Sequence, residues 1–165
     1  MTKVRLATRE DLSRIFEIEQ EAMSPPWSYV AFEEELGRDD SFFVAAMSNT
    51  TEPSPCVIAM NNTTNLSPCV CGYAIMRKVG DDGELLKIVV EKSSRGNGIG
   101  DLLMESVLDH TEENGFKAVF LEVRVGNIAA TRLYEKHGFK SVRIRKEYYN
   151  APFEDALIMV RGDMW

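Results

Sequence analysis

Three glycines, Gly96, Gly98 and Gly100, stand within the segment RGNGIG, directly after an apolar run and directly before a helical pattern. A glycine in an ordered element costs roughly 0.5–1 kcal/mol relative to alanine, so three of them indicate that something must approach this backbone closely. Free backbone N–H groups in front of a helix N-terminus favour a negatively charged ligand. The segment therefore predicts an anion site, and a glycine-rich turn without a ligand is the alternative.

Two familiar phosphate-binding motifs do not fit the segment. A Walker-type loop needs Lys followed by Ser or Thr after its last glycine, where this chain has Asp101. A dinucleotide fingerprint needs a third glycine at position 103, which is Leu103. The sequence therefore predicts neither of these two sites.

A carboxylate and a phenol further along the chain have the chemistry for proton transfer. Glu122 interrupts the apolar run KAVFLEV, and a buried carboxylate without a partner is expected to have a raised pKa or to bind a water molecule. Either property suits a general base, and the alternative is a salt bridge to Arg124 on the same strand face. Tyr134 lies on the inward face of the last predicted helix, where it is either a proton donor or a core tyrosine.

Alternating strands and helices must position these residues. Apolar and alternating runs predict seven strands, at residues 3–8, 41–47, 69–79, 84–91, 117–123, 140–149 and 154–160. Caps and glycine stops predict helices that begin after Thr8, after Ser28, after the glycine segment and after Asn127. The segment from Ser48 to Pro68 is expected to be a long surface loop, with CVIAM extending a strand. We expect one α/β (or α+β) layered domain over residues 1–165.

Composition narrows the class of protein. The chain has 165 residues, of which 44% are hydrophobic and 27% charged, as expected of a globular protein. A net charge of −7 argues against broad binding to nucleic acid, and no apolar segment approaches the roughly 18 residues that span a membrane. The N-terminus lacks a signal-peptide pattern, so we expect a cytoplasmic protein. Cys56, Cys69 and Cys71 are expected to be reduced and to have no function of their own. Cys69 and Cys71 are expected in a strand far from the motifs. No metal site is predicted.

Residues 95–100, RGNGIG, resemble the Arg/Gln-x-x-Gly-x-Gly/Ala signature of GCN5-related N-acetyltransferases, the GNAT superfamily. Three more stretches, EQEAMSPPWS, LEVRVGNIAATRLYEKHGF and YYNAPFEDALIM, resemble its ribosomal-protein-alanine (RimI-like) branch. The resemblance implies the GNAT fold, a mixed but mostly antiparallel sheet of about seven strands flanked by about four helices. It also implies an acetyl-CoA-dependent enzyme that acetylates a protein N-terminal α-amine, most specifically the N-terminal alanine of a small-subunit ribosomal protein.

The resemblance implies roles for individual residues. Glu122 would be the general base, through water, and Tyr134 the general acid for the departing thiolate. A bulge in the strand LKIVV would leave a backbone N–H free near Val90 for the carbonyl oxyanion. Loop amides would hold the pyrophosphate, and a side chain at Gly98 or Gly100 would block its approach. The implied acetyl-CoA-binding residues are Ile88, Val89, Val90, Arg95, Gly96, Asn97, Gly98, Ile99, Gly100, Asn127 and Tyr134. Asn127 is alternatively a helix cap alone.

The acceptor side is less defined. The resemblance implies a peptide site between MSPPWSYVAF and EYYNAPFED, with Trp27, Tyr148 and Tyr149 as walls or, alternatively, in ordinary packing. The stretch FEEELGRDD, together with Glu147, would supply an acidic field for a basic peptide or would simply be solvated. His110 and His137, near helix C-termini, receive no catalytic role.

Two departures from the branch pattern leave the substrate open: the long loop between Ser48 and Pro68, and His137 at a position that is more commonly apolar. The expected partners are the N-terminal peptide of a ribosomal or other protein and, at most, a second copy of the chain in a weak homodimer. Nucleic acid and membrane are not expected. The alternatives to the leading function are an acetyltransferase for a small-molecule amine or amino acid and a non-catalytic acyl-CoA-binding module.

Overall fold

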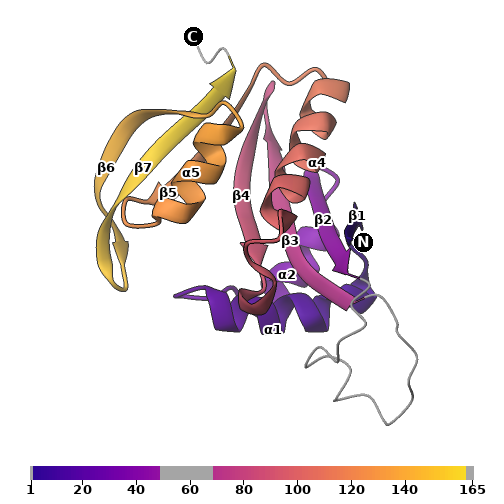
Figure 1. The fold of residues 1–165 in the computed structure, drawn as a ribbon. Coiled ribbons are helices and arrows are strands. Elements are labelled where there is room, and N and C mark those ends of the chain that lie inside the picture. Colours follow the sequence, from indigo (N-terminus) through magenta and orange to yellow (C-terminus); the bar gives the residue numbers. More distant parts are fainter. Residues whose placement is uncertain (1, 49–68, 163–165) are drawn as a thin grey trace.

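The runs predicted as strands form one seven-stranded sheet in the computed structural model, which describes residues 2–48 and 69–162 (Figure 1). The strands lie in the order β1-β2-β3-β4-β5-β7-β6, and only β4 and β5 run parallel. Their bounds are β1 (Thr2–Leu6), β2 (Ser41–Ser48), β3 (Cys69–Val79), β4 (Asp82–Val90), β5 (Ala118–Arg124), β6 (Lys140–Asn150) and β7 (Phe153–Gly162).

Four α-helices flank the sheet within the described residues: α1 (Leu12–Ala22), α2 (Tyr29–Leu36), α4 (Ile99–Glu113) and α5 (Ile128–Lys136). Two short 3₁₀ helices, η1 (Arg9–Asp11) and η2 (Lys92–Ser94), precede α1 and α4. The predicted fold class is therefore confirmed. Most of the predicted loop from Ser48 to Pro68, with Cys56 and the strand extension CVIAM, lies outside the described residues. Among the described helices, none has the length and apolar character needed to cross a bilayer.

The predicted helix boundaries follow local capping. The Ser28 hydroxyl accepts a hydrogen bond from the Ala31 N–H at 3.2 Å, and Asn127 Oδ1 accepts one from the Ala130 N–H at 3.2 Å. Such caps contribute about 1 kcal/mol each. Gly115 follows α4 at φ +66°, a left-handed conformation that only glycine adopts readily.

Two apolar clusters cover the two faces of the sheet. On one face, α1 and α2 supply Leu12, Ile15 and Phe32, which pack with Tyr73 of β3. On the other, strand residues pack against α4 and α5, whose contributions to the second cluster are Ile99, Leu103, Met104, Val107, Leu108 and Tyr134. Side chains along β5 alternate between the faces, so Glu122 and Arg124 point away from α4 and toward the α1 side.

The sheet opens between β4 and β5. Their ladder comprises only three pairs, from Gly83 opposite Val119 to Leu85 opposite Leu121. Beyond it, residues 86–90 continue along β3 and residues 122–124 continue along β7, so the two facing edges have no partner strand in the described chain. The neighbouring β3–β4 register shifts at the same point, because Met76 pairs with Leu85 and Ile75 with Lys87.

This register shift is a bulge at Leu86. A bulge in the stretch LKIVV was expected, and Leu86 is the first residue of that stretch, so this expectation is confirmed, while the free N–H near Val90 stays a prediction. The bulge falls where β4 leaves β5, because an extra residue bends a strand and increases its local twist. Consecutive residues Leu86 and Lys87 consequently both face the α1 side, where Leu86 packs against the apolar cluster and Lys87 contacts Glu19 of α1.

Candidate active site

The glycine loop presents backbone donors that the protein itself does not use. Gly96 and Gly98 have φ values of +79° and +74°, and Gly98 is the N-cap of α4. Within the described residues, the backbone N–H groups of residues 95–101 donate no hydrogen bond to a protein acceptor. Unpaired amides at the positive end of a helix favour an anion. The structure therefore has the local geometry that the sequence predicts for an anion site.

Gly100 stands at a close approach between two helices. A Cβ atom there would lie 3.3 Å from Leu133 Cδ2 of α5, which is tighter than ordinary packing. Nothing lies within 4 Å of a Cβ at Gly96 or Gly98. The first two glycines thus serve the backbone conformation, and the third allows α4 and α5 to approach each other.

Side chains on both sides of the loop hold it in place. Glu91, which follows β4, accepts hydrogen bonds from the Ser94 N–H at its carbonyl and from Ser94 Oγ at its carboxylate, and it forms an ion pair with Arg14 of α1. Arg95 Nε donates to the Val90 carbonyl at 3.1 Å, and Asn97 Nδ2 donates to the Ser94 carbonyl at 3.2 Å. The predicted residues Arg95 and Asn97 thus shape the loop. Sequence reasoning missed Arg14 and Glu91, which no local motif marks.

One expectation about the cysteines is wrong. Cys71 is not far from the motifs, because its carbonyl accepts the Glu91 N–H at 2.8 Å directly before the loop. Its thiol donates a hydrogen bond to the Ala46 carbonyl at 3.3 Å. Burial raises the pKa of the Cys71 thiol to about 11, so this thiol is not a reactive nucleophile at neutral pH.

Glu122 is neither unpartnered nor bound to Arg124. Its side chain is 23% exposed and accepts a hydrogen bond from Arg145 Nη1 of β6 at 2.9 Å. A hydrogen bond to Glu122 also raises the pKa of the Tyr148 hydroxyl to about 12. Both expectations for Glu122, burial without a partner and pairing with Arg124, are therefore wrong. Two side chains of β6 hold the carboxylate at the open edge of β5.

β6 has a local irregularity that follows Arg145 and includes Tyr148. Arg145 pairs with Ala156 and Tyr149 with Glu154, so residues 146–148 stand opposite Asp155 alone. Glu147 has φ +52°, and its N–H donates to Asp155 Oδ1 at 2.9 Å. The extra residues turn the side chains of β6 relative to a regular strand.

Tyr149 lies near Glu122, and Tyr134 lies near Tyr149. Tyr134 of α5 is buried against Phe139, with ring centroids 5.9 Å apart, and burial raises its pKa with a further effect from Tyr149. Burial also raises the pKa of Tyr149, and the charge of Glu122 raises it further. The ring of Tyr149 lies edge-on to that of Tyr148 at 5.0 Å. Tyr148 and Tyr149 of β6 thus lie near Glu122 of β5, and Tyr149 in turn lies near Tyr134 of α5.

Trp27, in the segment between α1 and α2, is half-buried rather than an open wall. Its ring lies 5.4 Å from that of Phe32, and the Lys87 ammonium stands 4.7 Å from its centroid. Its backbone N–H donates to Glu19 Oε1 at 2.8 Å. Glu19 is fully buried and also accepts from Tyr73 Oη and, at 2.5 Å, from Lys87 Nζ. The charged Lys87 inside the apolar run ELLKIVVE is the one sequence signal for this network.

Replacing Lys87 by Met should destabilise the protein by about 3–5 kcal/mol, because it leaves the buried charge of Glu19 without a cation. The double variant Glu19→Gln/Lys87→Met should recover most of this loss, since the neutral amide still bonds Tyr73 and the Trp27 N–H. Chemical denaturation of the three proteins measures both effects. Equal stabilities of the single and double variants would show that the charge of Glu19 is not the cause.

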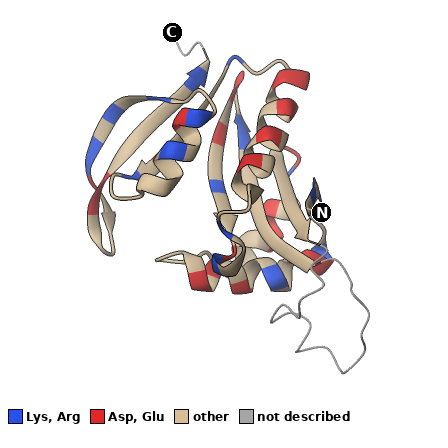
Figure 2. Cartoon of the chain, viewed as in Figure 1, with Lys and Arg blue, Asp and Glu red and all other residues tan. Residues whose placement is uncertain are grey.

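The remaining candidates have structural partners. In the acidic stretch FEEELGRDD, Glu35 is buried in an ion pair with Arg77, Glu33 pairs with Arg9, and Asp40 pairs with Arg38, so much of the expected acidic field is neutralised internally. His137 Nε2 and Lys136 Nζ contact Asp101 Oδ1 at 2.9 and 2.7 Å. These pairs join the C-terminal end of α5 to the first turn of α4. Figure 2 marks the positions of acidic residues along α4 and of basic residues on α5 and β6.

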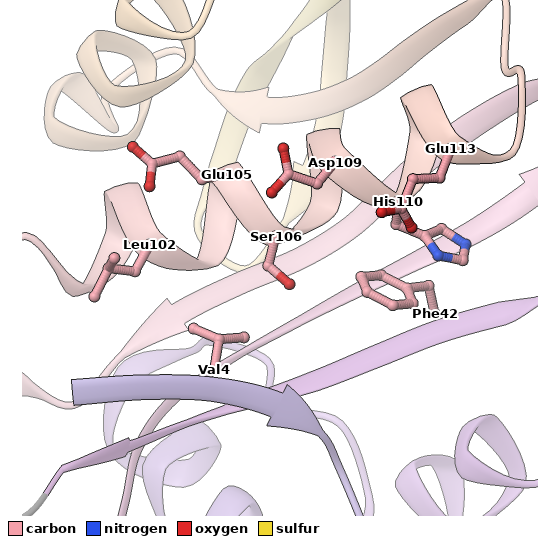
Figure 3. A pocket seen from close by; sticks show the side chains of 8 residues that line it. All are labelled: Val4, Phe42, Leu102, Glu105, Ser106, Asp109, His110 and Glu113. Atoms are coloured by element: carbon pink, nitrogen blue, oxygen red, sulfur yellow. The ribbon is translucent and has the colours of Figure 1, made fainter.

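A cavity of about 390 Å³ lies elsewhere, between α4 and the strands β1 and β2 (Figure 3). The ring of His110 stacks on Phe42 there, with centroids 3.8 Å apart. Burial lowers the pKa of His110, which keeps the ring neutral at pH 7. No predicted catalytic or binding residue lines this cavity, and packing accounts for His110.

Known proteins resemble this chain both in sequence and in fold. The family model of the Acetyltransferase (GNAT) family matches residues 12–139. A [ribosomal protein bS18]-alanine N-acetyltransferase of Salmonella typhimurium is 30% identical over 161 residues, which are 96% of this chain and 96% of the relative. The crystal structure of the corresponding Escherichia coli enzyme has a TM-score of 0.81 and 29% identity, over 98% of this chain and 94% of that one.

A solved structure of Arabidopsis thaliana NAA60 in complex with acetyl-CoA shares the fold, with a TM-score of 0.81, 18% identity and 98% of each chain covered. The family model spans more than half of the chain, from the first residue of α1 through the glycine loop to the residue before β6. The chain therefore belongs to the GNAT family of acetyltransferases.

Proposed function

We propose that this protein transfers the acetyl group of acetyl-CoA to the N-terminal α-amine of a protein, and that its acceptor is the N-terminal alanine of a small-subunit ribosomal protein. The relatives named for that reaction support the substrate class, because their similarity extends over nearly the whole chain. One observation carries the reaction type. The sheet opens between β4 and β5, with unpaired amides at residues 95–101 and a carboxylate at Glu122.

The residues present fit acetyl-CoA. The amides of the glycine loop are suited to its diphosphate, and the unpaired edge of residues 86–90 is suited to the amide groups of its pantetheine arm. Ile88 and Val90 pack against the α4 side and Val89 against the α1 side, so their backbone is the part left for a ligand. Asn127 uses Oδ1 for its cap, which leaves its side-chain nitrogen for binding. Bound acetyl-CoA supplies the acetyl thioester that the amine attacks.

Glu122 accepts the proton of the attacking amine, directly or through water. An α-amine has a pKa of about 7.7–8.0 and a lysine side chain about 10.4, a gap of about 2.5 units or ~3.4 kcal/mol of deprotonation work. A single carboxylate therefore suffices for an α-amine, whereas lysine needs further help. This difference favours a protein N-terminus over a lysine side chain as the acceptor.

Backbone and phenol donors complete the proposed chemistry. An N–H group on the open edge of β4, between the bulge at Leu86 and Val90, stabilises the negative charge on the acetyl oxygen. Tyr134 donates a hydrogen bond to the departing sulfur. Because its pKa is raised, Tyr134 keeps its proton throughout the neutral range and is always ready to donate. We place this reaction in the cytoplasm, where the named bacterial relatives would meet a ribosomal protein.

A panel of acceptors tests the proposal. Peptides that begin with Ala, Ser or Met, together with polyamines and free amino acids, are incubated with the protein and labelled acetyl-CoA, and small-subunit ribosomal proteins are analysed by mass spectrometry. We expect label on an N-terminal alanine. Label on the small amines alone would show that the substrate is a small amine and not a protein. Binding of the coenzyme without any acetyl transfer would show that the protein is a binding module and not an enzyme.

The glycine loop offers a matched test of coenzyme binding. Gly98→Ala places a Cβ at φ +74° and should lower the stability by roughly 1 kcal/mol and weaken acetyl-CoA binding about tenfold or more, because the amides are displaced. Gly80→Ala, at φ +62° in the turn between β3 and β4, should cost similar stability without affecting binding. Calorimetric titration with coenzyme A compares the two. Equal affinities would argue against a ligand at the loop.

A further inference from the structure

Arg124, the last residue of β5, joins two segments that are far apart in the sequence. Its Nη2 donates to the Ser24 carbonyl between α1 and α2 and to the Ala151 carbonyl between β6 and β7, both at 3.1 Å. Its Nη1 donates to the Pro152 carbonyl at 3.0 Å and to Glu154 Oε2 at 3.2 Å. One guanidinium therefore bridges the α1–α2 segment and the β6–β7 turn.

The guanidinium is held by an aromatic ring against its planar face as well as by the hydrogen bonds at its edge. Its central carbon lies 4.0 Å from the centroid of the Tyr149 ring, and only 21% of the Arg124 side chain is exposed. Four of its five N–H donors bond to protein acceptors. A group engaged in this way is not available to bind a substrate anion. Its planar fork suits it to join several acceptors, which a lysine ammonium cannot reproduce.

The bridged segments carry the proposed walls of the acceptor site. Ser24 precedes Trp27 by three residues, and Ala151 follows Tyr149 by two. The far end of the α1–α2 segment is fixed separately, by the bond from the Trp27 N–H to Glu19. Arg124 thus sets the distance between Ser24, at the α1 end of that segment, and the β6–β7 turn.

We propose that Arg124 is a positioning residue that sets the spacing between the two walls of the acceptor site, and thereby the affinity for the acceptor peptide. The inference rests on the proposed function, because it takes that site to be the place where the peptide enters. Glu154 neutralises the guanidinium and also accepts the Gly126 N–H at 2.6 Å, so a cationic amine can approach without repulsion. Arg124 has no role in holding acetyl-CoA.

The test is Arg124→Lys, which keeps the charge but cannot reach both segments. We expect the KM for the acceptor peptide to rise about tenfold, from the loss of two or more hydrogen bonds, with kcat and the KM for acetyl-CoA within about twofold of the parent. Glu154→Gln, which leaves the three carbonyl bonds in place, should raise the peptide KM about threefold. Arg143→Lys, an exposed arginine of β6, is the matched control and should change none of the three parameters.

Amide hydrogen exchange, followed by mass spectrometry on peptides covering residues 23–28 and 150–154, tests the bridge without any acceptor. Both segments should exchange faster in Arg124→Lys and neither in Arg143→Lys. An unchanged peptide KM, loosening of one segment only, or an equal rise in the KM for acetyl-CoA would each overturn the assignment. If Arg124→Lys does not fold, an unchanged peptide KM in Glu154→Gln overturns it. A parent protein that acetylates no peptide refutes the proposed function, while the exchange result still decides whether Arg124 bridges the segments.

Discussion

Glu122→Gln should lower turnover at pH 7 by about 10²–10³-fold, because the amide keeps the shape of the side chain but cannot accept the proton of the amine. The variant would then react only with acceptor that has already lost its proton. Its rate should therefore rise with pH until the α-amine, with a pKa of about 7.7–8.0, is fully neutral. The pH profile of kcat should move to the alkaline side.

Exposed Glu112 of α4 supplies the control, since Glu112→Gln removes the same charge from another part of the surface. That variant should keep both the rate and the profile of the parent. An unchanged pH profile in Glu122→Gln, even with a reduced rate, would remove Glu122 from the role of base. It would leave the residue as a partner of Arg145 and Tyr148 only.

Tyr134→Phe should lower kcat by about 10²-fold while the KM for acetyl-CoA stays within about twofold, because the hydroxyl acts on the sulfur only as it departs. The ring and its contact with Phe139 remain, so the stability should change by less than about 1 kcal/mol. Burial raises the pKa of Tyr134, which means that its charged form is disfavoured in the fold. An alkaline fall in the parent's rate below about pH 10 therefore has another origin, and the variant should keep the shape of the profile.

Full turnover in Tyr134→Phe would contradict this role and identify Tyr134 as a core residue alone. Steady-state kinetics and chemical denaturation of the same preparations separate the two roles. The expected pattern is a large loss of kcat with almost no loss of stability. A core tyrosine whose hydroxyl has no function would show neither.

Local sequence signals predicted the elements and the glycine loop, because caps, glycine stops and alternation act over a few residues. Ser28, Asn127 and Gly115 occupy the predicted positions at helix ends. The seven-stranded sheet followed from the family resemblance rather than from the pattern alone. The described structure confirms that sheet and its mostly antiparallel pairing.

The partners of the site residues could not be predicted in the same way. A salt bridge from Glu122 to Arg124 assumed that residues on one strand face meet, but side chains two positions apart are about 6.6 Å apart along the strand. Arg145 reaches Glu122 from β6, which is separated from β5 by β7, and Arg124 turns instead to Ser24, a hundred residues earlier. Such contacts depend on strand register and bulges, which a single sequence does not specify.

The three-pair ladder between β4 and β5 has a consequence for the dynamics of the molecule. Strands β1–β4 and strands β5–β7 each form a continuous set of long ladders. We therefore expect them to open as two separate cooperative units, joined only by the short β4–β5 ladder. A coenzyme that hydrogen-bonds to the unpaired main chain beyond the β4–β5 ladder would replace the inter-strand hydrogen bonds that are absent there and would couple the two units. At a concentration a hundred times its Kd, that coupling would add about 2.7 kcal/mol to the stability, so coenzyme saturation would govern how rigid the protein is.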